Sequence, residues 1–226
     1  MLELIDLTSL NDTDNTETIA ALCEQAVTPN GQAAAVCVYP QFISEAKKIL
    51  AGSSVRIATV VNFPQGNDVL ENVLAAIRQA ISDGADEIDV VFPYQDYLHG
   101  EKQKACDFIR ACKAACGEKI LLKVIIETGA LADSLVIAEV SYDVCHAGAD
   151  FLKTSTGKIS VGATPEAART LLTVIKKIPR TIGFKVSGGV RTVEQARQYI
   201  QLAEEIMGPG WVTPAHFRIG ASQLFV

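Results

Sequence analysis

The chain has 226 residues, of which 49% are hydrophobic and 20% are charged, a balance typical of a folded globular protein and far from that of a disordered one. Its formal net charge of −6 argues against a nucleic-acid or anionic-membrane partner, because either would require a broad basic surface. No basic segment followed by an apolar run opens the sequence, and no stretch is apolar enough to span a bilayer, so we expect a cytoplasmic protein.

Eight short runs rich in Val and Ile alternate with longer segments of helical period along the chain. This alternation is typical of parallel β/α units rather than of hairpins. The runs centre, in chain order, near Asp6, Cys37, Thr59, Asp89, Ile125, Lys153, Lys185 and Ile219. Their even spacing favours a closed barrel over an open sheet, and we predict a single (β/α)8 TIM barrel over residues 1–226.

Helix start signals support this count of units. Thr164 followed by Pro165 is typical of an N-cap and a first helical residue, and Thr192 with Gln195 forms a capping-box pattern. After the eighth run only residues 220–226 remain, so we expect the eighth helix to be truncated or missing.

Charged residues interrupt three of the apolar runs. Lys153, Lys185 and Asp89 each lie inside a predicted strand, and active sites of these barrels lie at the carboxyl ends of the strands. Two lysines at about 5 Å and an effective dielectric constant of about 20 repel by roughly 3 kcal/mol, so one of them can be neutral near pH 7. A neutral amine attacks an aldehyde, and a carboxylate can relay protons, which indicates Schiff-base chemistry. The alternative is a structural Lys–Asp–Lys ion network.

Two further charges lie in the fifth run. Lys123 comes too early in its strand to reach the carboxyl end, and we interpret it as structural and paired with a neighbouring carboxylate. Glu127 ends the same strand, where a hydrogen-bonded structural role is favoured over that of a base in an isomerase-type mechanism.

Glycine-rich turns follow the last three predicted strands. In such barrels the backbone N–H groups after strands seven and eight bind phosphate, and the absence of side chains lets an anion approach the backbone. The turns therefore predict a phosphosugar site, with candidate residues Thr156, Gly157, Lys158, Gly188, Gly189, Gly220 and Ser222.

The sequence offers little for a metal or a cofactor. Its three histidines, His99, His146 and His216, do not cluster at predicted strand ends, and no dinucleotide-binding fingerprint is present. None of the six cysteines stands in a C-x-x-C pair, so we expect reduced thiols. We predict chemistry without a metal or cofactor.

Taken together, these motifs strongly resemble deoxyribose-phosphate aldolases. The resemblance is carried by residues 151–158, 183–185 and 187–192, and it extends to 60–64, 87–93 and 123–129. It implies a class I aldolase that reversibly cleaves 2-deoxy-D-ribose 5-phosphate to D-glyceraldehyde 3-phosphate and acetaldehyde.

The resemblance also implies a role for each matching residue. Lys153 matches the Schiff-base lysine, Lys185 the second lysine that perturbs it, and Asp89 the acid/base carboxylate. Asp6 matches an aspartate near the sugar hydroxyls, and Cys37 a thiol near the site entrance. The positions around the substrate phosphate are matched by Gly157, Lys158, Gly188, Gly189, Gly220 and Ser222.

The chain departs from the family pattern at two positions. The family commonly has Ala or Pro where this chain has Val186, and often a second Ser where this chain has Gln223. We expect these differences to alter the affinity for phosphate. The final helix and Tyr-ending tail of many members are not seen in this sequence. A transaldolase-type Schiff-base aldolase and a non-catalytic phosphosugar-binding barrel are the alternative functions. Exposed apolar surface beside the shortened eighth unit would favour a homodimer.

Overall fold

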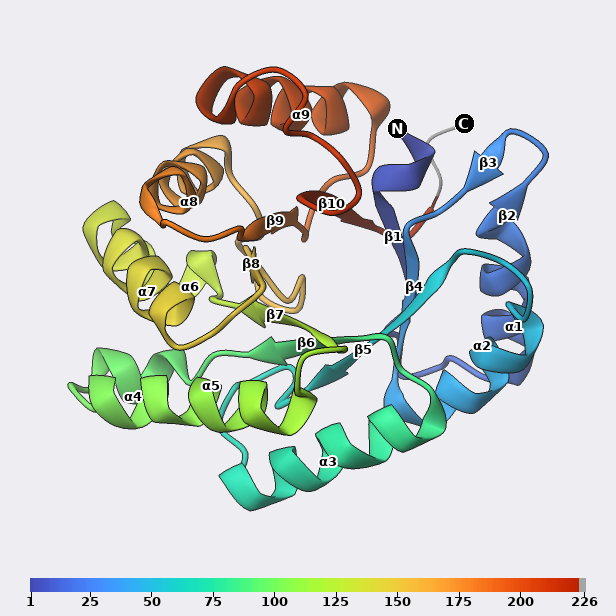
Figure 1. The fold of residues 1–226 in the computed structure, drawn as a ribbon, viewed down its shortest axis with the longest axis horizontal. Helices are drawn as coiled ribbons and strands as arrows, with labels where there is room; N and C mark the ends of the chain where they lie inside the picture. The colour runs from blue at the N-terminus through green and yellow to red at the C-terminus, as the bar shows by residue number, and fades with distance from the viewer. Residues whose placement is uncertain (224–226) are drawn as a thin grey trace.

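The computed structural model describes residues 1–223. Eight parallel strands form a closed barrel in the order β1-β10-β9-β8-β7-β6-β5-β4, with helices on the outside (Figure 1). The barrel strands are β1 (Ile5–Thr8), β4 (Ala35–Val38), β5 (Arg56–Val61), β6 (Glu87–Val91), β7 (Leu121–Ile125), β8 (Phe151–Lys153), β9 (Gly183–Val186) and β10 (Phe217–Ala221). All eight predicted strand centres lie within these strands, so the predicted barrel is confirmed.

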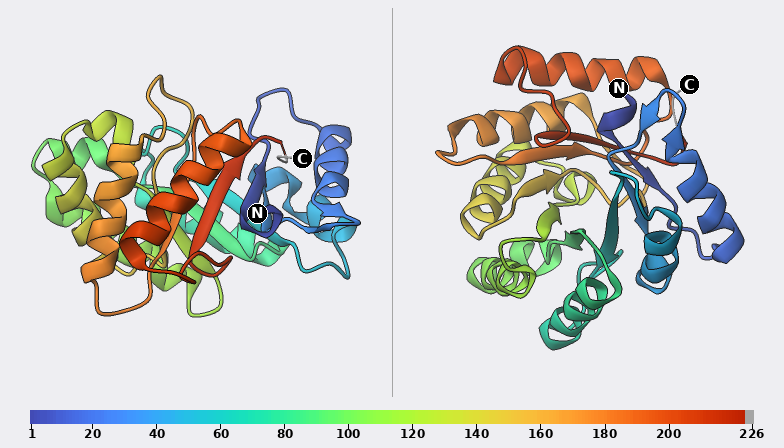
Figure 2. Two further views of the ribbon diagram at one scale, coloured as in Figure 1. Left: turned by 90° about the horizontal axis from the view of Figure 1, so that it is seen from above. Right: turned by 45° about the vertical axis from the view of Figure 1, so that its right-hand side comes forward.

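Helices follow the strands along the chain, and Figure 2 shows them outside the strands from two further directions. The main helices are α1 (Thr16–Gln25), α2 (Ile43–Ile49), α3 (Leu70–Asp83), α5 (Lys102–Cys116), α7 (Ser134–His146), α8 (Pro165–Lys177) and α9 (Val193–Met207). The shorter helical segments are η1 (Leu2–Leu4), η2 (Pro40–Phe42), α4 (Tyr94–Leu98) and α6 (Thr128–Leu131).

Both predicted helix starts are confirmed. The Thr164 side chain accepts a hydrogen bond from the Ala167 N–H, and Pro165 occupies the first position of α8. Thr192 and Gln195 form a reciprocal capping box at the start of α9. These local bonds satisfy backbone donors that the first helical turn would otherwise leave without a partner.

The strands are buried on both faces, which explains why they read as continuous apolar runs rather than as an alternating pattern. Most apolar side chains pack between the strands and the helices. A separate small cluster around Ala35, Cys37, Ala58 and Val60 packs with Leu10. The buried charges described below lie on β1 and on β6 to β10.

Two features differ from or go beyond the sequence expectation. A two-stranded antiparallel hairpin, β2 (Val27–Thr28) and β3 (Gly31–Gln32), lies outside the barrel and was not predicted. Within residues 1–223 no helix follows β10. The apolar residues 224–226, on which an eighth helix could begin, lie outside the described residues.

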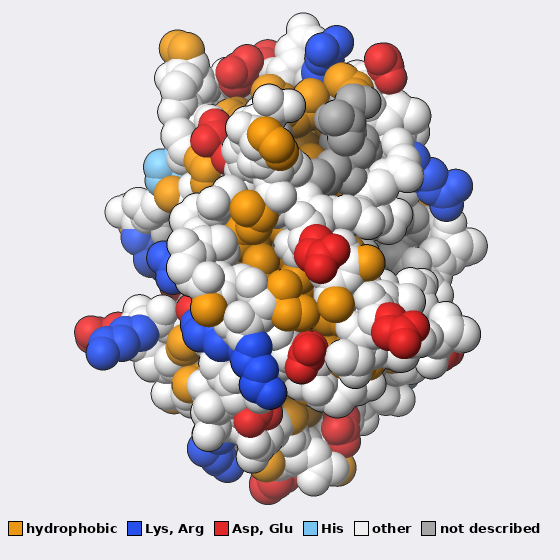
Figure 3. Space-filling view, turned by 90° about the vertical axis from the view of Figure 1, so that its right-hand side faces the viewer, with side chains coloured by type: hydrophobic (Ala, Val, Ile, Leu, Met, Phe, Trp, Pro, Cys, Tyr) orange, Lys and Arg blue, Asp and Glu red, His pale blue; other side chains and the backbone are white. Residues whose placement is uncertain are grey.

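The described surface carries charged side chains of both signs, as the mixed composition of the sequence predicts. Figure 3 shows the side of the molecule that carries α1, α2 and the hairpin, with acidic and basic side chains interspersed over its described part. No helix within residues 1–223 is long and apolar enough to cross a membrane.

Candidate active site

Asp89 lies at the centre of a buried group of lysines. Its Oδ2 atom is 2.7 Å from the Lys153 Nζ and 2.8 Å from the Lys185 Nζ, and its Oδ1 atom is 2.7 Å from the Lys123 Nζ. The register of the barrel makes these contacts possible, because it pairs Lys153 with Lys185 across β8 and β9, and Asp89 with Lys123 across β6 and β7. The structure therefore brings together the two lysines and the aspartate that the sequence singled out.

Further charges extend this ion network toward the amino-terminal end of the barrel. Asp6 forms ion pairs with Lys185 at 2.6 Å and with Arg218 at 2.7 Å, while Glu87 contacts Lys123 at 2.6 Å and Arg218 at 3.0 Å. Lys123 is thus paired with neighbouring carboxylates, as its structural interpretation requires. Arg218 and Glu87 were not predicted as members, since nothing in the sequence indicates that β10 places an arginine beside β6.

The network holds more positive than negative groups. Its cations are Lys123, Lys153, Lys185 and Arg218, and its carboxylates are Asp6, Glu87 and Asp89. Four cations face three anions in a buried space, so one positive charge is left unbalanced if every group is ionised. Loss of one proton from a lysine balances the charges, which is favourable away from water.

Lys153 is the lysine that loses its proton most readily. Burial, together with the charge of Lys185, lowers the pKa of Lys153 against the attraction of Asp89. Burial also disfavours the charged form of Lys185, but Asp6 and Asp89 outweigh it and raise the pKa of Lys185. Burial by itself would raise the pKa of Asp89, yet the three ammonium groups outweigh burial and hold the pKa well below the usual range of an aspartate. The pKa values of the two lysines are therefore shifted in opposite directions, so Lys153 loses its proton more readily than Lys185.

Lys153 also differs from the other lysines in access. Its side chain is 4% exposed, whereas those of Lys123 and Lys185 are 0% exposed. Lys153 lines a cavity of about 240 Å³ at the carboxyl ends of β1, β8, β9 and β10. A carbonyl compound in this cavity can reach the Lys153 amine.

Every predicted phosphate-binding residue lines the same cavity, namely Thr156, Gly157, Lys158, Gly188, Gly189, Gly220 and Ser222. Gly157, Gly188 and Gly189 have φ angles of 76°, 83° and 98°, a region that favours glycine and that exposes backbone N–H groups in a turn. Lys158 adds a cation beside them. The wall of the cavity thus combines an amine with loops suited to an anion.

The cavity has further polar lining that the sequence reasoning missed. Thr8 and Asn11 follow β1, while Ser187 and Arg191 follow β9. Their position directly after strands of the barrel was the signal that could have identified them.

Asp6 and Cys37 do not line this cavity. Asp6 is fully buried, and its two oxygen atoms form ion pairs with Lys185 and Arg218. Its place near the sugar hydroxyls stays a prediction. Cys37 is 0% exposed and packs in the small apolar cluster, and burial raises the pKa of its thiol. The thiol is thus buried in the barrel interior, and its place near the site entrance stays a prediction.

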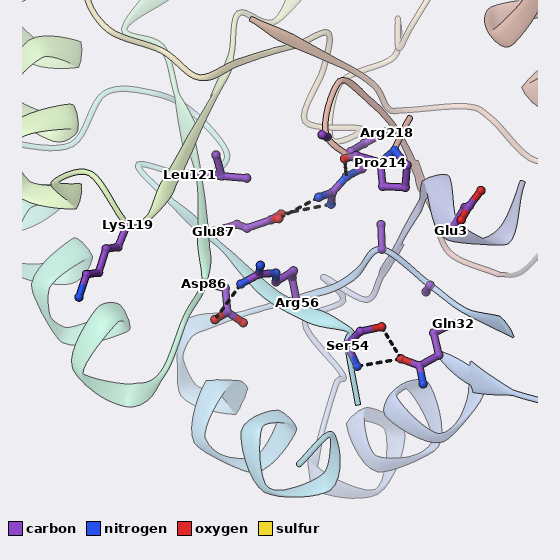
Figure 4. A pocket seen from close by; sticks show the side chains of 13 residues that line it. Glu3, Gln32, Ser54, Arg56, Asp86, Glu87, Lys119, Leu121, Pro214 and Arg218 are labelled. Atoms are coloured by element: carbon purple, nitrogen blue, oxygen red, sulfur yellow. Dashed lines mark hydrogen bonds and ion pairs between the residues drawn. The ribbon is translucent and has the colours of Figure 1, made fainter. Parts of the chain in front are cut away.

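A larger cavity, of about 560 Å³, lies at the opposite end of the barrel (Figure 4). The hydrogen-bonded pair Glu87 and Arg218 borders it, and the side chains of Arg56 and Lys119 also line it. None of the predicted catalytic or phosphate-binding residues lines this cavity. Chemistry in this fold occurs at the carboxyl ends of the strands, so we place the active site in the smaller cavity.

Two of the three histidines contact aromatic rings elsewhere. His146 packs against Tyr142 in a tilted arrangement at the end of α7, and His216 stacks on Trp211 before β10. Within residues 1–223, no group of three or more His, Cys, Asp and Glu residues is arranged to hold a metal ion.

A (β/α)8 barrel that carries a lysine of lowered pKa at the carboxyl end of a strand, beside glycine-rich loops, is the architecture of a lysine-dependent barrel aldolase. The chain belongs to the DeoC/LacD family of aldolases, whose family model matches residues 1–216. It is accordingly an aldolase, a carbon–carbon lyase.

Solved structures support the assignment. A protein from Coccidioides immitis, provisionally assigned as a deoxyribose-phosphate aldolase, is 29% identical with a TM-score of 0.87, over 98% of this chain and 81% of that one. The aldolase QR15 is 26% identical with a TM-score of 0.83, over 98% of this chain and 90% of that one. The tetrameric deoxyribose phosphate aldolase from Aeropyrum pernix is 24% identical with a TM-score of 0.79, over 98% of this chain and 86% of that one, and shows the shared fold.

Proposed function

We propose that this aldolase reversibly cleaves 2-deoxy-D-ribose 5-phosphate to D-glyceraldehyde 3-phosphate and acetaldehyde through a Schiff base on Lys153. The observation that carries the proposal is the cavity of about 240 Å³, which is lined by Lys153 and by the glycine-containing loops after β8, β9 and β10. The names of the similar proteins from Coccidioides immitis and Aeropyrum pernix support the choice of substrate.

The proposed reaction begins with attack of the neutral Lys153 amine on the C1 aldehyde of the open-chain sugar. The resulting carbinolamine loses water as the protonated Lys185 supplies a proton. The Asp89 carboxylate is hydrogen-bonded to the Nζ atoms of both Lys153 and Lys185, so it can pass protons between them. The product is an iminium ion at C1.

The iminium ion then accepts the electron pair of the C2–C3 bond. The C3 hydroxyl passes its proton to water in the cavity, D-glyceraldehyde 3-phosphate leaves, and an enamine of the two remaining carbons stays on Lys153. The released proton is equivalent to the one that the enamine takes up at C2 in the next step. Protonation of the enamine at C2 and hydrolysis of the new iminium ion release acetaldehyde and restore the amine. The water lost in the first step is regained in the last, so the reaction is balanced without an oxidant or reductant.

Reductive trapping tests this proposal. Acetaldehyde with borohydride should leave an N-ethyl group on the peptide that contains Lys153, whereas peptides that contain exposed lysines such as Lys48 serve as internal controls. An unmodified Lys153 in an enzyme that remains active would refute the Schiff base. Cleavage of ketose donors in place of deoxyribose 5-phosphate would favour the transaldolase-type alternative. Binding of the sugar phosphate without any cleavage would favour the non-catalytic alternative.

We also propose that the chain forms a homodimer and acts in the cytoplasm. Leu135 and Tyr142 support self-association, since they lie two turns apart on α7 and are 80% and 52% exposed. The six free, buried cysteines support a reducing compartment. Light scattering with size-exclusion chromatography tests the first proposal, and Leu135→Glu should then yield monomers.

A further inference from the structure

The segment after β7 contains a residue in an unusual backbone conformation. Glu127 has φ 54° and ψ 61°, the left-handed region that residues other than glycine rarely adopt. The backbone on either side is held by β8, because the Ile126 N–H donates to the Lys153 carbonyl at 3.0 Å and the Thr128 N–H donates to the Thr154 carbonyl at 2.9 Å. Such a conformation persists only where the surrounding structure determines it. It turns the Glu127 side chain toward the loop that follows β8.

The Glu127 carboxylate is fully buried against that loop. Its Oε2 atom accepts from the Thr156 hydroxyl at 2.5 Å, and its Oε1 atom accepts from the Thr156 backbone N–H at 3.3 Å. Since the hydroxyl hydrogen is directed at Glu127, the Thr156 Oγ1 lone pairs are free to accept, and they accept from the Lys158 N–H at 3.0 Å. A chain of hydrogen bonds thus runs from Glu127 through Thr156 to Lys158.

The same loop makes close backbone contacts with both neighbouring segments. A Cβ atom on Gly129 would lie 2.1 Å from the Val161 carbonyl oxygen, and a Cβ atom on Gly162 would lie 2.2 Å from the Gly188 carbonyl oxygen. The Ala163 N–H also donates to the Gly188 carbonyl at 2.9 Å. The loop after β8 is therefore fixed between the segment after β7 and the loop after β9.

Glu127 itself does not line the cavity that receives the anion, while Thr156, Gly157 and Lys158 do. A carboxylate facing the cavity would repel a phosphate group. Thr156 covers it instead, so that Glu127 contributes hydrogen bonds to the loop without presenting its charge to the ligand.

We propose that Glu127 is a positioning residue for the anionic end of the substrate, which it orders through Thr156 and the Gly157–Lys158 backbone. This inference rests on the proposed function, since it takes the anion to be the phosphate of the sugar. It assigns Glu127 to substrate affinity rather than to the proton transfers at Lys153.

Glu127→Gln tests the inference, because glutamine keeps the size but turns an N–H donor toward the donors of Thr156. The loss of a charge-assisted hydrogen bond should raise KM for 2-deoxyribose 5-phosphate about tenfold or more. The ratio of kcat/KM for the phosphorylated sugar to that for 2-deoxyribose should fall by the same factor. The dissociation constant of inorganic phosphate, measured by calorimetry, should rise with it. Glu118→Gln, at an exposed position, is the matched control.

A second pair of variants keeps the test valid if Glu127→Gln does not fold. Thr156→Val removes the hydroxyl and should reproduce the loss of phosphate affinity, whereas Thr156→Ser retains the hydroxyl and should restore it. A fall in kcat that is equal for both sugars, with phosphate binding unchanged, would overturn the inference. Trapping of Lys153 by acetaldehyde involves no phosphate, so failure of the parent enzyme in that assay would instead refute the proposed function.

Discussion

Replacement of Lys185 by methionine should shift the pH range in which Lys153 reacts. The two Nζ atoms lie 2.8 and 2.7 Å from the same Asp89 oxygen, so they are at most about 5.5 Å apart. At about 5 Å and an effective dielectric constant of about 20, two ammonium groups repel by roughly 3 kcal/mol, equal to roughly two pKa units. Methionine fills a similar volume but removes this repulsion, and it also leaves Asp89 shared between Lys153 and Lys123 only. Both effects raise the pKa of Lys153.

The sign of the pH effect follows from the reactive form. Lysine attacks a carbonyl as the neutral amine, which predominates above its pKa, so a raised pKa moves the onset of reaction to higher pH. We expect the pH midpoint for alkylation of Lys153 to rise by about two pH units in Lys185→Met. The assay is the rate at which acetaldehyde and cyanoborohydride alkylate Lys153, followed by mass spectrometry as a function of pH. The assay requires only Schiff-base formation, and it compares the pH midpoint rather than the maximal rate, because Lys185 also supplies a proton when the carbinolamine loses water.

Lys185→Arg is the control, since it keeps the positive charge and should leave the midpoint near that of the parent. Thermal unfolding establishes that each variant is folded before it is assayed. A midpoint in Lys185→Met that stays within about half a pH unit of the parent, or that falls, would refute the electrostatic reasoning.

Three further predictions concern other parts of the site. Asp89→Asn should lower the free energy of unfolding in urea by about 3–5 kcal/mol, because it leaves buried cations unpaired, and a loss below about 1 kcal/mol would contradict this. Gly188→Ala should weaken inorganic phosphate binding about tenfold, since Gly188 has φ 83° and a Cβ atom would lie 3.3 Å from neighbouring backbone carbons. Gly208→Ala, with φ 99° and open space around it, should leave phosphate binding unchanged, and equal losses in both variants would argue against a specific role for Gly188. Because burial raises the pKa of the thiol, Cys37 should react with iodoacetamide no faster than the buried Cys112 in the folded protein, and selective alkylation of Cys37 would show that the barrel interior opens.

The order of elements could be read from the sequence because it depends on short-range signals. Apolar runs of strand length and helix caps such as Thr192 with Gln195 involve residues within a few positions of one another, and the structure confirms both. The hairpin of residues 27–32 was missed because its strands are only two residues long and show no alternating pattern.

The sequence by itself also indicated that Lys153 and the glycines after β8 and β9 lie at one rim of the barrel. Lys153 ends an apolar run and the glycines follow such runs, and in a parallel barrel the ends of all such runs meet at one rim. Position along the chain is sufficient for this inference, because the direction of every strand is the same.

Only the tertiary structure decided how the charges are shared. The pairing of Arg218 with Asp6 spans 212 positions, and that of Lys185 with Asp89 spans 96, so their partners depend on the register with which the barrel closes. The same closure covers Cys37 and turns Glu127 onto Thr156. Register and burial are set by the packing of the whole barrel, and for that reason no local pattern in the sequence could specify them.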